Sequence, residues 1–136
     1  MRGWSANIED ATVDNETFRT VVFTGDSLQV TVMSLRPGEE IGTEVHDGLD
    51  QFIRVEQGRA DVLMGPSKHD LSEIHQLEDD WAVVIPGGTW HNVINRGDSA
   101  LKLYSIYAPP EHPDGAVHPT KADAEAAEAA EAEHEG

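Results

Sequence analysis

Short runs of β-branched, aromatic and aliphatic residues, each closed by a turn signal, constrain the fold of this chain more than any other feature. Turns such as Gly25-Asp26, Pro37-Gly38 and Gly97-Asp98 separate neighbouring runs, and no long helical pattern lies among them. This spacing is typical of an all-β sandwich or barrel with antiparallel strands. The expected strands cover residues 17–24, 27–35, 41–46, 51–55, 60–64, 81–85, 90–95 and 101–107.

The segments outside these runs differ in composition. Residues 1–16 are polar and are predicted to form an N-terminal arm before a barrel at residues 17–108. Residues 109–120 are proline-rich, which excludes a central strand or a regular helix, so this extension is expected to lie over the surface. Residues 121–136 are almost entirely alanine and acid. Like charges three residues apart oppose a helix there, so we expect a frayed or disordered tail.

Charge restricts the partners of the chain. Nine Lys and Arg residues stand against 26 Asp and Glu residues, which gives a net charge of −17. Nucleic acids and anionic membranes need a basic surface, so both are excluded as partners. The acidic surface suits either the high-salt cytoplasm of a halophile or an ordinary acidic protein. The absence of cysteine excludes disulfides and thiolate metal sites, and the first residues lack the apolar run of a signal peptide, so we expect a cytoplasmic protein.

Alternation along the predicted strands selects the polar side chains that face the interior. Glu44 and His46 are two residues apart and therefore share one face of a strand. His91 shares a face with apolar Val93, and Gln51 lies on the face of its strand that carries no charge. A lone carboxylate is costly to bury. A bound cation would remove this cost and explain why these groups converge.

Two segments around these residues resemble the two sequence motifs of the cupin superfamily. The first motif is a glycine, five residues, His-x-His, three or four residues, Glu, six residues and a glycine. In this chain it begins at Gly38 and ends at Gly58 with correct spacing. The second motif is matched in full at Pro86, Gly88, His91 and Asn95. The resemblance covers residues 38–95 and implies an antiparallel jelly-roll β-barrel.

The chain departs from the cupin pattern at two ligand positions. Glu44 stands where the family has its first histidine, and Gln51 stands where it has glutamate. Carried over by position, the resemblance implies that Glu44, His46, Gln51 and His91 bind a divalent transition metal: Zn, Mn, Fe or Ni. Asp50 is a rival ligand, although strand alternation points it away if Gln51 faces inward. The alternative is a metal-free barrel in which Glu44 and Gln51 hydrogen-bond the histidines.

The resemblance further implies a small single-domain cupin similar to mannose-6-phosphate isomerase, acting on a small polar metabolite such as a sugar or sugar phosphate. A side chain would move a proton while the metal holds neighbouring oxygens, and the candidates for this catalytic role are Glu44, Tyr107 and His112. An Fe(II)-dependent dioxygenase is the first alternative, because His46, His91 and Glu44 form a two-histidine, one-carboxylate set. A non-catalytic ligand-binding cupin is the second.

Two further expectations concern the substrate charge and a protein partner. Basic residues that could bind a phosphate are few, namely Arg19, Arg54 and Lys102. An outward apolar set would suit a homodimer. This set consists of Phe52, Trp90 and Ile94.

Overall fold

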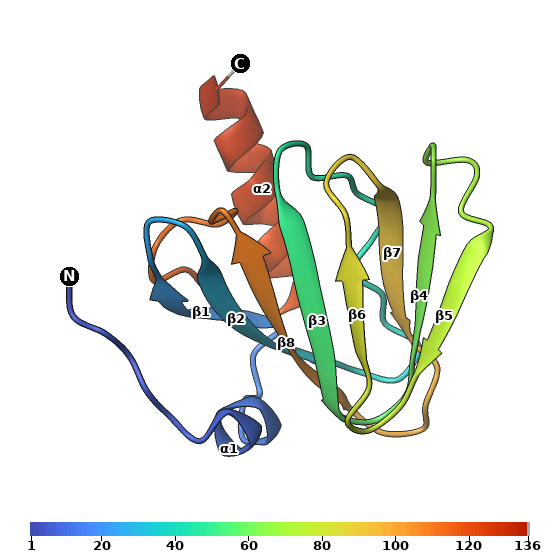
Figure 1. Ribbon diagram of the computed structural model, residues 1–136, viewed down its shortest axis with the longest axis horizontal. Coiled ribbons are helices and arrows are strands. Elements are labelled where there is room, and N and C mark those ends of the chain that lie inside the picture. Colours follow the sequence, from blue (N-terminus) through green and yellow to red (C-terminus); the bar gives the residue numbers. More distant parts are fainter. Residues whose placement is uncertain (136) are drawn as a thin grey trace.

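The computed structural model, which describes residues 1–135, consists of two antiparallel β-sheets that enclose one core (Figure 1). One sheet has the strand order β6-β3-β8-β2-β1-β9, and the other has the order β5-β4-β7. This arrangement confirms the predicted antiparallel jelly-roll β-barrel. The strands are β1 (Arg19–Thr24), β2 (Gln29–Leu35), β3 (Asp50–Gln57), β4 (Ala60–Gly65), β5 (Glu73–Leu77), β6 (Ala82–Ile85), β7 (Trp90–Asn95), β8 (Leu101–Ala108) and β9 (Val117–His118), and the helices are α1 (Ile8–Val13) and α2 (Lys121–Glu135).

The barrel interior is apolar at one end. Strand register aligns Leu103 of β8 with Met33 of β2 on one side and with Val55 of β3 on the other. In the second sheet, Val62 of β4 lies opposite Val93 of β7. All five side chains are buried. Burial of a side chain of this size stabilises the fold by about 1.5–3 kcal/mol.

The same strands present polar groups to the interior at the other end. Tyr107 of β8 is aligned with Gln29 of β2 and with Gln51 of β3. His91 begins the inward face of β7. Each of these four residues is at most 2% exposed. The alternation that buries the apolar end therefore also buries these polar groups.

The segment around Glu44 differs from the strand predicted at residues 41–46. It pairs with β7 through isolated bridges rather than a continuous ladder, and one of these bridges pairs Glu44 with His91. Gly42 has a φ of 108°, and its amide donates to Asn92 Oδ1 at 2.9 Å. This left-handed glycine and its side-chain acceptor interrupt the ladder. The pairing still places Glu44 directly beside His91, with two backbone hydrogen bonds of 2.9 Å.

Helix α2, drawn in red in Figure 1, stands where a frayed or disordered tail was predicted at residues 121–136. Its first turn is capped reciprocally: the Asp123 amide donates to Thr120 Oγ1 at 3.2 Å, and the Thr120 amide donates to Asp123 Oδ2 at 3.1 Å. That prediction was based on repulsion among the glutamates and took no account of this cap. Gly136, the last residue of the predicted tail, lies outside the described residues.

Two contacts dock α2 onto the barrel. Ala124 is 2% exposed and belongs to the core cluster. Glu128 Oε1 lies 3.3 Å from Nη1 of Arg19, which comes from β1. A tail of alanine and acid thus finds both an apolar and an ionic contact, which composition alone did not reveal.

Gln29 holds the proline-rich extension, residues 109–120, over the polar end of the barrel. Its Oε1 accepts hydrogen bonds from the amides of Glu111 and His112 at 3.1 and 2.9 Å. Its Nε2 donates to the His112 carbonyl at 2.8 Å. Further along, β9 pairs with β1 at the edge of the larger sheet. One buried glutamine therefore positions two side chains of the extension.

The N-terminal arm predicted at residues 1–16 contains helix α1. Asn7 caps this helix, because its Oδ1 accepts a hydrogen bond from the Asp10 amide at 3.0 Å. Neither helix in the described part of the chain combines the length and the apolar character that crossing a membrane requires.

The apolar set predicted to form a homodimer contact is partly covered within one chain. Ile94 is buried, and Phe52 packs against Tyr104 with ring centroids 6.2 Å apart. Exposed apolar side chains near the sheet edges include Ile74, Trp81, Val84 and Val117. The homodimer stays a prediction.

Candidate metal centre

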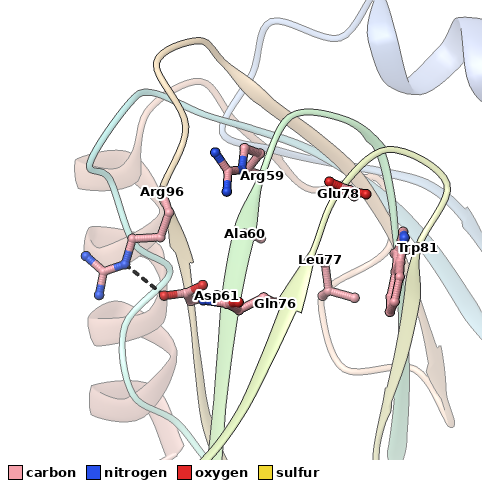
Figure 2. Close-up of a pocket in the computed structure, with 8 residues that line it drawn as sticks. All are labelled: Arg59, Ala60, Asp61, Gln76, Leu77, Glu78, Trp81 and Arg96. Atoms are coloured by element: carbon pink, nitrogen blue, oxygen red, sulfur yellow. Dashed lines mark hydrogen bonds and ion pairs between the residues drawn. The ribbon is translucent and has the colours of Figure 1, made fainter.

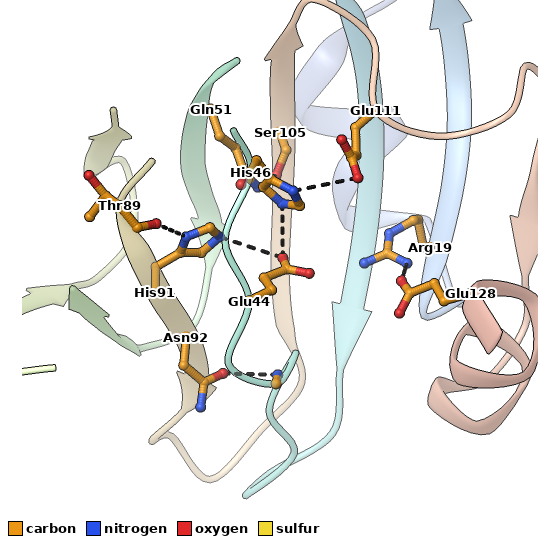
Figure 3. Close-up of polar contacts among 11 residues, drawn as sticks. Arg19, Glu44, His46, Gln51, Thr89, His91, Asn92, Ser105, Glu111 and Glu128 are labelled. Atoms are coloured by element: carbon orange, nitrogen blue, oxygen red, sulfur yellow. Dashed lines mark hydrogen bonds and ion pairs between the residues drawn. The ribbon is translucent and has the colours of Figure 1, made fainter. Parts of the chain in front are cut away.

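Three of the four predicted ligands lie together at the polar end of the barrel (Figure 3). The ligand atoms of Glu44, His46 and His91 all lie within 4.8 Å of one another. Glu44 Oε1 is 3.2 Å from His46 Nε2 and 3.5 Å from His91 Nε2. Donors with this spacing surround a single position, and nitrogen and oxygen donors of this kind suit a divalent transition metal.

The backbone fixes the tautomer of His91. Its Nδ1 lies 2.9 Å from the carbonyl oxygen of Thr89, so Nδ1 carries the proton and donates it. Its Nε2 is then unprotonated and can coordinate a cation through its lone pair. This atom is buried and has no hydrogen-bond partner among the described residues. Metal-binding histidines are commonly oriented by such a hydrogen bond on the other ring nitrogen.

Gln51 rather than Asp50 is turned into the barrel interior. Gln51 is 2% exposed, and its Nε2 donates to Ser105 Oγ at 3.4 Å. Its Oε1 is buried without a hydrogen-bond partner in the described part of the chain, which costs about 1–3 kcal/mol for a carbonyl. Asp50 is exposed and accepts a hydrogen bond from the Gly87 amide at 2.8 Å. Two orphaned buried atoms, Gln51 Oε1 and His91 Nε2, therefore fit a bound cation.

The charges of the cluster depend on one another. Burial raises the pKa of Glu44, but the hydrogen bond and the charge of His46 outweigh this and hold it well below its usual range. Burial lowers the pKa of His46, but the carboxylates of Glu111 and Glu44 raise it to about 9. Glu111 Oε1 lies 3.5 Å from His46 Nδ1. Without a metal, the cluster therefore holds a positive charge on His46 at the place where a cation would bind.

Tyr107 and His112, the other two catalytic candidates, lie beside His46. The Tyr107 ring centroid is 5.9 Å from that of His46 and 5.1 Å from that of His112. Burial, together with the charge of Arg19, lowers the pKa of His112 to about 4. Burial raises the pKa of Tyr107 above its usual range. At neutral pH, His112 is therefore unprotonated and Tyr107 keeps its proton.

A cavity of about 440 Å³ opens above the cluster. Its wall is strongly acidic and is formed by the barrel end, the proline-rich extension and helix α2. The lining residues are Glu44, Val45, His46, Glu111, His112, Glu128 and Glu131.

The family model described as "Cupin domain" matches residues 31–107, more than half of the chain. The chain belongs to the cupin family. The matched segment contains the two motifs and all four predicted ligands. Cupins commonly bind transition metals, and the cluster of Glu44, His46 and His91 is consistent with such a site.

Two curated relatives are similar to this cupin. It is 61% identical over 122 residues to the uncharacterized protein YrkC of Bacillus subtilis, covering 90% of this chain and 66% of that protein. It is 41% identical over 112 residues to the uncharacterized protein L612 of Acanthamoeba polyphaga mimivirus, covering 82% of this chain and 68% of that protein. The cupin thus spans about two thirds of the length of these relatives.

Solved structures agree with the fold. The crystal structure of BH2720 from Bacillus halodurans has a TM-score of 0.90 and 56% identity, covering 92% of this chain and 95% of that chain. KdgF from Halomonas sp. has a TM-score of 0.60 and 22% identity, covering 68% and 78% of the two chains. At 22% identity, the similarity to KdgF shows a shared fold and nothing more.

Of the three candidates for binding a substrate anion, only Arg19 lies behind the cavity of this cupin. Arg19 is 1% exposed and contacts the cavity residue Glu128 (Figure 3). Arg54 instead pairs with Glu56, with Nε and Oε1 3.0 Å apart. Lys102 donates to the carbonyl of Asn15.

A second pocket, of about 460 Å³, lies at the opposite end of β7 from His91, where Arg96 follows the strand. Figure 2 shows the residues that line it. Arg59, Glu78 and Arg96 line it and are exposed. Arg96 Nε pairs with Asp61 Oδ2 at 3.1 Å. The charged side chains of this pocket are exposed to solvent or paired. The candidate metal centre differs, because it buries polar atoms that have no hydrogen-bond partner among the described residues.

Sequence reasoning assigned no site role to Glu111 or Glu128. Glu111 reaches His46 only because Gln29 holds its backbone, and Glu128 reaches Arg19 only because α2 folds. The expectation that His112 lies near the site could have suggested the same for Glu111, which precedes it in the sequence. The motif residue Asn95 is structural: its Nδ2 donates to the carbonyls of Leu35 and Ser99 at 3.0 and 2.9 Å.

Proposed function

We propose that this cupin is a metal-dependent enzyme that acts on a small polar metabolite with neighbouring oxygens, in an isomerase-like proton transfer related to that of the mannose-6-phosphate isomerase-like cupins. The observation that carries the proposal is the cluster of Glu44, His46 and His91 within 4.8 Å. The orphaned Gln51 Oε1 supports it. These four residues would hold the metal.

A divalent metal at this place would act as a Lewis acid toward substrate oxygens. The roles of the side chains follow from their positions. Glu44 is turned toward both histidines, so it serves as a ligand rather than as the base. His112 is unprotonated at neutral pH, and its buried Nε2 has no hydrogen-bond partner among the described residues, so it is available to accept the substrate proton. Tyr107, protonated beside it, orients the His112 ring.

Deuterium incorporation tests this role of His112. Metal-loaded protein would be incubated in D₂O with a panel of aldoses, ketoses and sugar acids, and exchange at the carbon next to the carbonyl would be followed by NMR. We expect exchange with at least one class and its loss in His112→Phe with the metal retained. His75→Phe, on an exposed residue of β5, is the matched control and should exchange like wild type. Equal exchange in both variants would remove His112 from the mechanism.

An Fe(II)-dependent dioxygenase is the second candidate, favoured by the two-histidine, one-carboxylate composition of the cluster. Oxygen uptake that requires added Fe(II) and a substrate from the same panel would support it over proton transfer. If metal-loaded protein shows neither exchange nor oxygen uptake, a non-catalytic ligand-binding role replaces both.

A further inference from the structure

Arg19 is a buried cation with few partners. It is 1% exposed, and its guanidinium carbon lies 5.4 Å from the ring centroid of Phe18. Its Nη1 donates to Glu128 Oε1 at 3.3 Å, a long hydrogen bond. Its Nε is buried and has no acceptor within residues 1–135. An arginine has five N–H donors, and a buried charge needs a close partner, so this site is incompletely satisfied.

The partner of Arg19 comes from the last helix. The Glu128 side chain is 45% exposed and extends from α2 toward Arg19 (Figure 3). Burial raises the pKa of Glu128, although Arg19 opposes this effect. The contact thus joins a fixed, fully buried cation to a carboxylate on a helix at the surface.

The ion pair of Arg19 and Glu128 borders the cavity above the candidate metal centre. Glu128 lines that cavity together with Glu44, His46 and His112, and Arg19 lies behind it. The charge of Arg19 acts on His112. Loss of the Glu128 carboxylate would therefore leave Arg19 without this ion-pair partner beside the cavity.

We propose that Arg19 binds a carboxylate group of the substrate, and that Glu128 occupies this position in the free protein. The inference rests on the proposed function, because it places the substrate in the same cavity, and it narrows the substrate class to carboxylate-bearing metabolites. An arginine fork matches the two oxygens of a carboxylate. The carboxylates of Glu44, Glu111 and Glu131 face the same cavity and repel a phosphate dianion more strongly than a monoanion.

Acetate is the probe for the test, and metal-free protein is titrated with it by calorimetry. Glu128→Gln keeps the shape of the side chain and removes its charge. We expect this variant to bind acetate roughly tenfold more tightly than wild type, because the competing carboxylate is gone. Glu125→Gln makes the same charge change on an exposed residue that pairs with Lys121, and it should bind acetate like wild type.

The second step adds Arg19→Gln to Glu128→Gln, so that no carboxylate is left without its partner. The gain in acetate affinity should be lost, while circular dichroism shows that the barrel remains folded. Equal acetate affinities of Glu128→Gln and Glu125→Gln would overturn the inference, even if the double variant fails to fold. Tighter binding of inorganic phosphate than of acetate to Glu128→Gln would overturn the carboxylate assignment.

These titrations need no metal. A protein that binds metal but gains no acetate affinity in Glu128→Gln would retain the proposed function and lose this inference. A protein that gains acetate affinity in Glu128→Gln but binds no metal would retain this inference about Arg19 and lose the proposed metal-dependent function.

Discussion

Leu103 and Tyr107 face the same interior from one strand, four residues apart, yet their surroundings differ. Leu103 lies between Met33 and Val55, and all three are fully buried. Tyr107 lies beside His46, below a cavity whose wall is mostly carboxylate. One end of the barrel is packed to exclude water, whereas the other buries polar atoms that find no partner within the described chain. The apolar end therefore supplies most of the folding stability. The unpaired polar atoms at the other end lower the stability but form the candidate metal centre.

The largest effect on stability is expected at the apolar end. Leu103→Ala should lower the free energy of unfolding by about 2–5 kcal/mol, because Leu103 is fully buried and its removal leaves a cavity. Urea unfolding measures this loss, and metal content after refolding should be unchanged. A loss below about 1 kcal/mol would show that this end is not the stabilising one.

Gln51→Leu should separate stability from metal binding at the polar end. The free energy of unfolding of the metal-free protein should stay the same or rise by about 1 kcal/mol, since an unpaired buried carbonyl is removed. The dissociation constant for the metal should rise by roughly 10–100-fold. Competition with a chelating dye measures the affinity. Asp50→Leu, at the neighbouring exposed position, is the control, and equal weakening by both variants would remove Gln51 from the ligand set.

Gln29→Leu should release the proline-rich extension with the smallest cost, about 1 kcal/mol, because the freed backbone groups become hydrated. Hydrogen exchange at the amides of Glu111 and His112 should accelerate, whereas exchange within β8 should not. Gln76→Leu, on the exposed face of β5, should leave all of these rates unchanged. Unchanged exchange in Gln29→Leu would mean that other contacts hold the extension.

Alternation along the chain predicted β1, β2, β3, β4, β6, β7 and β8, and it brought most of the candidate ligands together. It did not predict β5 or β9, and residues 41–46 form no regular strand. The rule that Gln51 faces inward and Asp50 outward follows from the pleat, and the structure agrees. The motif spacing brought His91 and Glu44 into one site even though the segment around Glu44 is not a regular strand.

What the sequence did not reveal depends on contacts between distant segments. Helix α2 is stabilised by a cap at Thr120 and by an ion pair that joins residues 19 and 128, and neither is visible in an alanine-rich composition. Glu111 likewise reaches His46 only through the hydrogen bonds of Gln29, which lies 82 residues away in the sequence.

Metal content is the most direct test of the metal centre proposed for Glu44, His46, Gln51 and His91. Protein expressed without an affinity tag would be dialysed and analysed by plasma mass spectrometry beside the double variant His46→Ala, His91→Ala. We expect close to one transition-metal ion per chain in the wild type and none in the variant. Zinc, manganese or nickel would favour proton transfer, and iron would favour oxygen chemistry. A wild-type protein that binds no metal after reconstitution with each of these ions would contradict the account.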